Sequence, residues 1–152
     1  MKTLVTYFSA EGTTAKIAEQ MAKALEADIF EIRPEQLYTK ADLKYMNPMA
    51  RCNKEKIGKK DVPVEGKIEN FDAYDLVLIG FPIWYAVAPN VINTFCKGYD
   101  WTGKKVALFA TSGGSGIGKT KEKLQPYVKG TEIVDAIRAK DPQDFIDWAK
   151  SL

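Results

Sequence analysis

The 152-residue chain has no histidine, only two cysteines and no long apolar run. The absence of histidine excludes imidazole acid–base catalysis, the common serine and cysteine triads and most zinc sites. Cys52 and Cys96 stand far apart and outside any Cys-x-x-Cys pattern, so we expect packed thiols in a reducing compartment. No stretch approaches the roughly 20 apolar residues that a transmembrane helix needs, and no signal peptide follows Met1. We therefore expect a cytoplasmic protein that does not bind membranes.

The net charge is only +2, which gives no reason to expect a nucleic-acid partner. Hydrophobic residues make up 45% of the chain and charged residues 28%, as in an ordinary globular protein. At this length the chain can bury one hydrophobic core, which predicts a single domain over residues 1–152.

Buried strands and amphipathic helices alternate along most of the chain. Short apolar or β-branched runs predict the strands, and apolar residues at helical spacing predict the helices. The expected strands are 3–8, 29–32, 76–81, 106–110 and 133–137, and the expected helices are 15–25, 87–99, 119–128 and a last one opened by Asp141-Pro142. Such alternation is typical of an α/β fold with a parallel sheet covered by helices on both faces. A ligand would then lie outside the carboxyl ends of the strands.

One connector, residues 33–70, interrupts this alternation. It holds nine basic against six acidic residues, more positive excess than the whole chain carries. So long a crossover often borders a site, but we favour the simpler interpretation, a solvated connector with a basic face.

The first loop with a chemical signature is Ser9, Ala10, Glu11, Gly12, Thr13 and Thr14, between the first strand and the first helix. Backbone N–H groups at a helix N-terminus, aided by hydroxyl side chains, can hold a phosphate without any lysine or arginine. The alternative is a plain helix cap, with Thr13 or Thr14 as the capping residue.

Two further loops open at the same edge of the predicted sheet. Pro82, Ile83, Trp84 and Tyr85 offer flat apolar side chains on which a ring system can stack, although Trp84 could instead cover the sheet edge. The third loop is rich in glycine, which lets backbone amides approach a ligand closely or simply makes a flexible turn. Its residues are Thr111, Ser112, Gly113, Gly114, Ser115 and Gly116.

The same third loop matches the phosphate-binding pattern GxxxxGK[ST] of nucleotide triphosphatases over residues 113–120. That function would place Lys119 on the phosphates and Thr120 on magnesium. No later strand ends in the aspartate that would complete the metal site, and the first loop would have no role. We therefore disfavour a triphosphatase.

The quoted motifs resemble those of the flavodoxin family. TYFSAEGTTAKIAEQMA is similar to the family's strand, phosphate loop and first helix, and IGFPIWYAVAP and ATSGGSG resemble its two flavin-ring loops. The resemblance extends over nearly the whole chain. It implies a three-layer α/β/α sandwich whose five parallel strands follow the order 2-1-3-4-5.

By position, the resemblance implies that the first loop holds the phosphate of FMN and that the second flanks the isoalloxazine, with Trp84 as the stacking residue. The amides of Ser112 to Gly116 would lie near N1 and O2 of the ring. Such a protein carries electrons between redox partner proteins, as a monomer or a weak dimer, while the flavin performs the chemistry.

Two alternatives remain on the same fold. The third loop has no aromatic residue and could leave one ring face open, as an NAD(P)H-dependent FMN or quinone reductase would require. If the protein is an enzyme, it is thus an FMN-dependent oxidoreductase. A flavin-free interaction module is disfavoured, because it would leave the phosphate loop without a purpose.

Overall fold

A computed structural model describes residues 2–9, 12–34, 64–83, 89–111 and 120–152. Its main sheet has five parallel strands in the order β2-β1-β5-β6-β7. Counted along the chain within this sheet, the order is 2-1-3-4-5, which confirms the predicted fold class. The strands are β1 (Thr3–Tyr7), β2 (Asp28–Glu31), β5 (Leu76–Pro82), β6 (Lys105–Thr111) and β7 (Ile133–Arg138).

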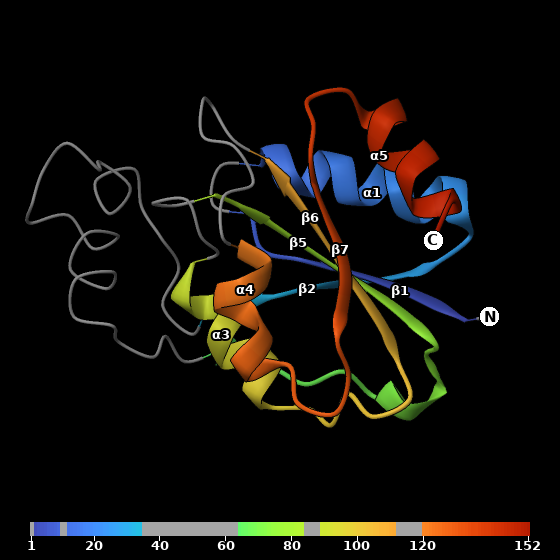
Figure 1. The fold of residues 1–152 in the computed structure, drawn as a ribbon. Helices are drawn as coiled ribbons and strands as arrows, with labels where there is room; N and C mark the ends of the chain where they lie inside the picture. Colours follow the sequence, from blue (N-terminus) through green and yellow to red (C-terminus); the bar gives the residue numbers. More distant parts are fainter. Residues whose placement is uncertain (1, 10–11, 35–63, 84–88, 112–119) are drawn as a thin grey trace, which may run out of the picture.

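Helices cover both faces of this sheet (Figure 1). Helices α1 (Thr13–Leu25) and α5 (Pro142–Lys150) pack together on one face. Helix α3 (Asn90–Lys97) and helix α4 (Thr120–Leu124) lie on the other. Short 3-10 turns at Phe71–Ala73 and Gln125–Tyr127 complete the described elements.

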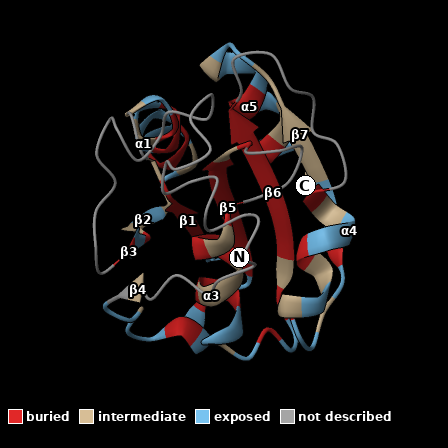
Figure 2. Ribbon diagram, turned by 90° about the vertical axis from the view of Figure 1, so that its left-hand side faces the viewer, coloured by how far each residue is buried: buried red, intermediate tan, exposed pale blue. Residues whose placement is uncertain are grey.

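The two helical layers enclose two separate hydrophobic cores, because alternate residues of each central strand point to opposite faces. Val5, Leu78 and Phe109 pack against α1 and α5, whereas Leu4 and Ile79 pack against the α3 and α4 layer. Strands β1, β5 and β6 are therefore buried along nearly their whole length (Figure 2). This burial explains why their sequences are continuously apolar rather than alternating.

The long connector is closed by a short antiparallel ladder. Strand β3 (Arg33–Pro34), where the chain leaves the sheet, pairs with strand β4 (Val64–Glu65), where it returns. Residues 35–63 of the connector lie outside the described residues.

After β4, the 3-10 turn is held by Lys104. The ammonium of Lys104 donates hydrogen bonds to the carbonyls of Phe71 and Tyr74, at 2.8 and 2.7 Å.

Several predicted elements differ from the observed ones at their ends. The first helix begins at Thr13 rather than Ala15. Helix α3 begins at Asn90 because Pro89, with ψ of 152°, is extended and serves as its N-cap. The predicted helix 119–128 is a five-residue α4 followed by a 3-10 turn whose Pro126 lacks the N–H of a regular helix. The last helix begins as predicted, with Asp141 Oδ1 accepting from the Gln143 amide at 2.9 Å.

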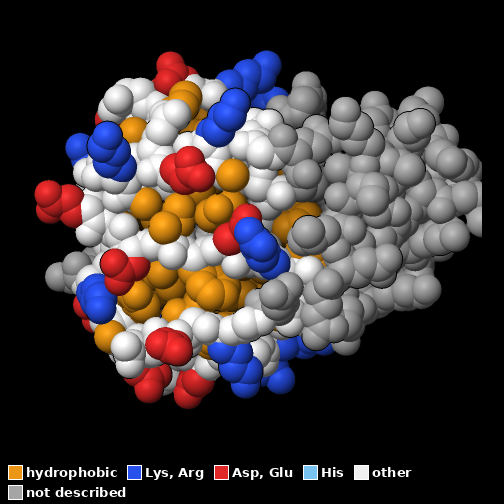
Figure 3. Space-filling view, turned by 180° about the vertical axis from the view of Figure 1, so that it is seen from behind, with side chains coloured by type: hydrophobic (Ala, Val, Ile, Leu, Met, Phe, Trp, Pro, Cys, Tyr) orange, Lys and Arg blue, Asp and Glu red, His pale blue; other side chains and the backbone are white. Residues whose placement is uncertain are grey.

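The two edge strands leave apolar side chains in solvent. Ile29 on β2 and Val134 on β7 are both 44% exposed. Figure 3 views the molecule from the side opposite to β7, where hydrophobic patches are interspersed with charges of both signs. Among the described helices, none is long and apolar enough to cross a membrane.

Candidate functional site

The three loops singled out in the sequence begin at one edge of the sheet. Tyr7 of β1 pairs with Gly80 of β5, and Gly80 pairs with Phe109 of β6. Since these strands are parallel, the chain leaves all three at their shared carboxyl edge. This is the edge at which ligands bind in open parallel sheets.

The first loop ends in a helix N-terminus that no side chain caps. Gly12 is the N-cap residue, with φ of +95°, and a Cβ at this position would meet nothing within 4 Å. Its amide donates to Ser9 Oγ at 3.0 Å, and its carbonyl accepts from the Lys16 amide at 3.2 Å. The first turn of α1 contains no acidic residue.

This arrangement excludes the plain-cap interpretation, because neither Thr13 nor Thr14 is the N-cap residue. Both lie inside the helix, where their amides precede the first intrahelical hydrogen bond. A helix end without a capping side chain keeps its partial positive charge and its N–H groups available to an anion. Thr13 is exposed at this end, whereas Thr14 is 98% buried.

A contact between two threonines joins the first and third loops. Thr14 Oγ1 lies 2.8 Å from Thr111 Oγ1, and both side chains are buried. Thr111 is the last residue of β6 and directly precedes the glycine-rich loop. Both residues were predicted to lie in the site, but this contact was not predicted, because the two positions are 97 residues apart.

The start of the second loop is also bonded to Thr111. Pro82 pairs with Thr111 in the sheet, and the Ile83 amide donates to the Thr111 carbonyl at 2.9 Å. The side chain of Ile83 belongs to the core on the α3 side and is only 8% exposed. Ile83 therefore attaches the start of the second loop to the hydrophobic core.

Nine of the predicted site residues lie outside the described residues. They are Ala10, Glu11, Trp84, Tyr85, Ser112, Gly113, Gly114, Ser115 and Gly116. The described part of the site consists of Ser9, Gly12, Thr13, Thr14, Pro82, Ile83 and Thr111.

Tyr7, at the carboxyl end of β1, lies near acidic side chains. Burial, followed by the nearby charges of Glu31 and Glu19, raises the pKa of Tyr7. Arg33 forms an ion pair with Glu31, so its charge is already partly neutralised.

Among the described residues, two buried side-chain atoms have no hydrogen-bond partner: Thr120 Oγ1 and Arg138 Nε. Thr120 starts α4, and Arg138 ends β7 beside Ala110. In the sequence, Thr120 stood out only as part of the triphosphatase pattern, and Arg138 was not singled out. A charged residue at the carboxyl end of a strand was the signal that could have drawn attention to it.

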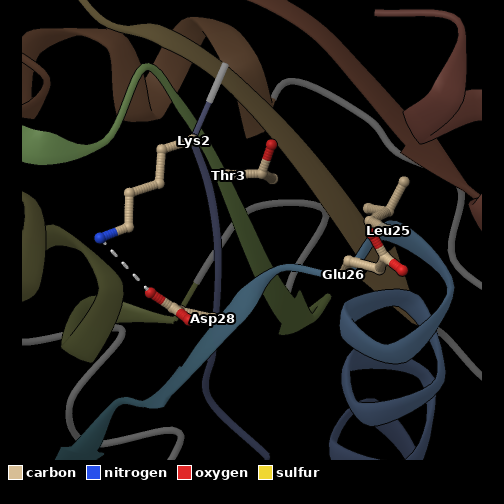
Figure 4. Close-up of a pocket in the computed structure, with 5 residues that line it drawn as sticks. All are labelled: Lys2, Thr3, Leu25, Glu26 and Asp28. Carbon is tan, nitrogen blue, oxygen red and sulfur yellow. Dashed lines mark ion pairs between the residues drawn. The ribbon is translucent and has the colours of Figure 1, made fainter.

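A shallow cavity of about 380 Å³ lies at the opposite end of the sheet (Figure 4). Lys2 and Thr3 line it from the start of β1, and Leu25, Glu26 and Asp28 from the turn between α1 and β2. Lys2 Nζ lies 3.9 Å from Asp28 Oδ2, with both side chains more than half exposed, so this ion pair contributes little stability. The cavity is not part of the predicted site.

Comparison with known proteins agrees with this architecture. The family model described as Flavodoxin matches residues 2–141. The chain belongs to the flavodoxin family. No curated protein sequence matches it significantly.

Three solved structures illustrate how closely the fold is shared. A candidate flavoprotein from Bacteroides eggerthii is 39% identical, with a TM-score of 0.90 over 99% of this chain and 96% of its own. Another from Bacteroides uniformis is 38% identical, with a TM-score of 0.89 over 98% and 97%. A flavoprotein from Lactobacillus acidophilus, solved in complex with FMN, is 25% identical, with a TM-score of 0.75 over 97% and 98%.

Proposed function

We propose that this protein binds FMN and carries electrons between redox partner proteins in the cytoplasm. The observation that carries the proposal is the uncapped N-terminus of α1 at the sheet edge where the second and third loops also begin. The FMN complex of the Lactobacillus acidophilus flavoprotein supports the choice of flavin. Family membership supports it independently.

The described residues fit the phosphate group of FMN. The open space at Gly12 lets a ligand approach the backbone, and the absence of an acidic residue in the first turn avoids repulsion of a dianion. Ser9 Oγ accepts from the Gly12 amide and so orients the loop, while its own hydroxyl hydrogen stays available as a donor. The exposed hydroxyl of Thr13 adds a second donor at the helix end.

The ring-binding side of the proposed site starts from rigid backbone. The hydrogen bond from Ile83 to Thr111 and the buried side chain of Ile83 fix the point from which Trp84 and Tyr85 follow. A ring held against the buried carboxyl ends of β5 and β6 would be shielded from water. FMN supplies the electron-accepting chemistry when bound, and these residues bind and orient it.

A visible spectrum recorded during anaerobic stepwise reduction tests this function, with NAD(P)H added to a parallel sample. Reduction in two separate one-electron steps, without bleaching by NAD(P)H, is the result expected of a carrier. Direct bleaching by NAD(P)H with steady turnover would instead establish a reductase. A colourless protein that ignores added FMN would disprove flavin binding.

A further inference from the structure

Thr111 contacts residues of the first and second loops and is itself the first residue of the third. Its hydroxyl lies 2.8 Å from Thr14 Oγ1, next to the phosphate-binding helix end. Its carbonyl accepts from the amide of Ile83, where the second loop begins. The glycine-rich third loop follows it directly in the chain.

The two threonine hydroxyls have two hydrogens to donate, but the described residues provide an acceptor for only one of them. Each hydroxyl has one hydrogen to donate and two lone pairs to accept with. The contact between Thr14 and Thr111 uses one of the two hydrogens. Neither hydroxyl has another partner in the described part of the chain, although Thr14 is 2% exposed and Thr111 only 6%. A buried O–H without an acceptor is costly, so the second hydrogen marks a place where a ligand oxygen would be stabilised.

The position of the two residues decides which hydroxyl would reach the ligand. Thr14 lies in the first turn of α1, beside the free amides, whereas Thr111 is the last residue of β6. If Thr111 donates to Thr14, the hydrogen of Thr14 is free to donate to a phosphate oxygen. Hydrogen bonds in such a chain strengthen one another.

We propose that Thr111 is a positioning residue for the phosphate of FMN. By donating to Thr14, it directs the Thr14 hydroxyl toward the phosphate and thereby favours FMN over riboflavin, which has no phosphate. The proposal rests on the proposed function. It assigns Thr111 a role through Thr14 in place of the direct contact with the cofactor that the sequence suggested.

The test compares FMN and riboflavin affinities, measured by flavin fluorescence, for the wild type and Thr111→Val. We expect FMN affinity to fall about fivefold, the worth of one hydrogen bond, with little change for riboflavin. Thr111→Ser should restore most of the FMN affinity, because it keeps the hydroxyl. In a Thr14→Val background, Thr111→Val should have no further effect on FMN, since the residue through which it acts is gone.

Thr6→Val is the matched control. Thr6 is also a fully buried threonine of the sheet, and its hydroxyl donates to the Leu78 carbonyl at 2.9 Å. Its replacement should lower the free energy of unfolding through the loss of that bond. The ratio of FMN affinity to riboflavin affinity should stay the same as in the wild type.

Inorganic phosphate provides a readout that does not depend on flavin. At constant ionic strength it should raise the midpoint of thermal unfolding of the wild type and Thr6→Val, and raise that of Thr111→Val less. Equal loss of FMN and riboflavin affinity in Thr111→Val, or an unchanged ratio, would overturn the proposal. A wild type stabilised by phosphate but indifferent to both flavins would instead disprove the proposed function, and the phosphate response of Thr111→Val would still decide the role of Thr111. A wild type indifferent to phosphate and flavins would overturn both.

Discussion

Gly80 of β5 shows how closely the central strands pack at the level of single residues. It pairs with Phe109 of β6, and a Cβ built at position 80 would lie 2.1 Å from Phe109 Cζ. Phe109 is itself fully buried and packs edge-to-face on Phe145, with ring centroids 6.0 Å apart. The ring therefore has little room to move away.

Gly80→Ala should lower the free energy of unfolding by about 1–3 kcal/mol through overpacking. Urea denaturation of the single variants and of Gly80→Ala/Phe109→Leu checks the cause, because a smaller side chain at position 109 should relieve the clash. The double variant should lose less than the sum of the two single losses. Strict additivity would show that the ring is not the obstacle.

Tyr74 makes the stability of the molecule sensitive to alkaline pH. Burial, followed by a hydrogen bond from its hydroxyl to Asp28 Oδ2 at 2.7 Å, raises the pKa of Tyr74 from 10.0 to about 12. Since the folded state holds the proton more tightly than the unfolded state, this contribution to stability is complete below pH 10. It is lost as the pH rises toward about 12.

Tyr74→Phe removes this dependence. We expect the variant to be less stable than the wild type at pH 8 and the two free energies of unfolding to converge between about pH 10 and 12. Chemical denaturation over this pH range measures both curves. Parallel curves would mean that Tyr74 titrates at the same pH in the folded and unfolded states.

At the scale of elements, Lys104 attaches the 3-10 turn Phe71–Ala73 to the end of the sheet. Its side chain is buried, donates to two carbonyls and lies 4.6 Å from the centre of the Phe71 ring. Lys104→Met keeps the apolar stem but leaves both carbonyls without their donor. We expect a loss of about 2–4 kcal/mol in unfolding free energy, against about 0.5 kcal/mol or less for the control Lys105→Met. Similar losses in the two variants would contradict a specific role for Lys104.

The N-terminus of α1 provides a prediction in which stability and binding change in opposite directions. Thr13→Asp should stabilise the ligand-free protein by about 0.5 kcal/mol, since an acidic residue in the first turn favours the helix dipole. The same carboxylate should weaken FMN binding by about a hundredfold or more through repulsion of the phosphate. Thermal unfolding and flavin titration measure the two effects, with the uncharged Thr13→Asn as control. Unchanged FMN affinity in Thr13→Asp would show that the phosphate of FMN does not bind at this helix end.

The sequence predicted the elements well and their ends less well, for identifiable reasons. Strands such as Leu76–Pro82 are buried on both faces, so their apolar runs are unambiguous. Helix ends depend on single backbone angles, and neither the left-handed Gly12 nor the extended Pro89 was recognised as a cap. The ladder between β3 and β4 was not predicted either, because two-residue strands carry no periodicity.

For the molecule as a whole, FMN binding should raise the free energy of unfolding. A ligand that binds only the folded state at about 100 times its dissociation constant adds about 2.7 kcal/mol to the free energy of unfolding. We expect FMN to raise the unfolding midpoint in this concentration-dependent manner, and riboflavin to raise it less at equal concentration. A midpoint independent of FMN concentration would contradict specific binding to the folded chain.

The shared edge at which the three candidate loops leave the sheet could be predicted from the sequence, because it follows from strand direction alone. The Thr14–Thr111 contact could not, since it depends on the register between β1, β5 and β6 and on the side to which each residue points. The same limit explains why Arg138 was not considered. Its place beside Ala110 follows from the pairing of β6 with β7, which includes a register shift after Val106.

The two ends of the described chain lie away from the carboxyl edge of the sheet (Figure 1). Lys2 precedes β1 at the amino edge, and Leu152 follows α5, which packs along α1. A protein anchored to an electrode through either end would hold the proposed flavin edge outward, toward the solution. Fusing an enzyme to the chain at either end would likewise leave that edge accessible.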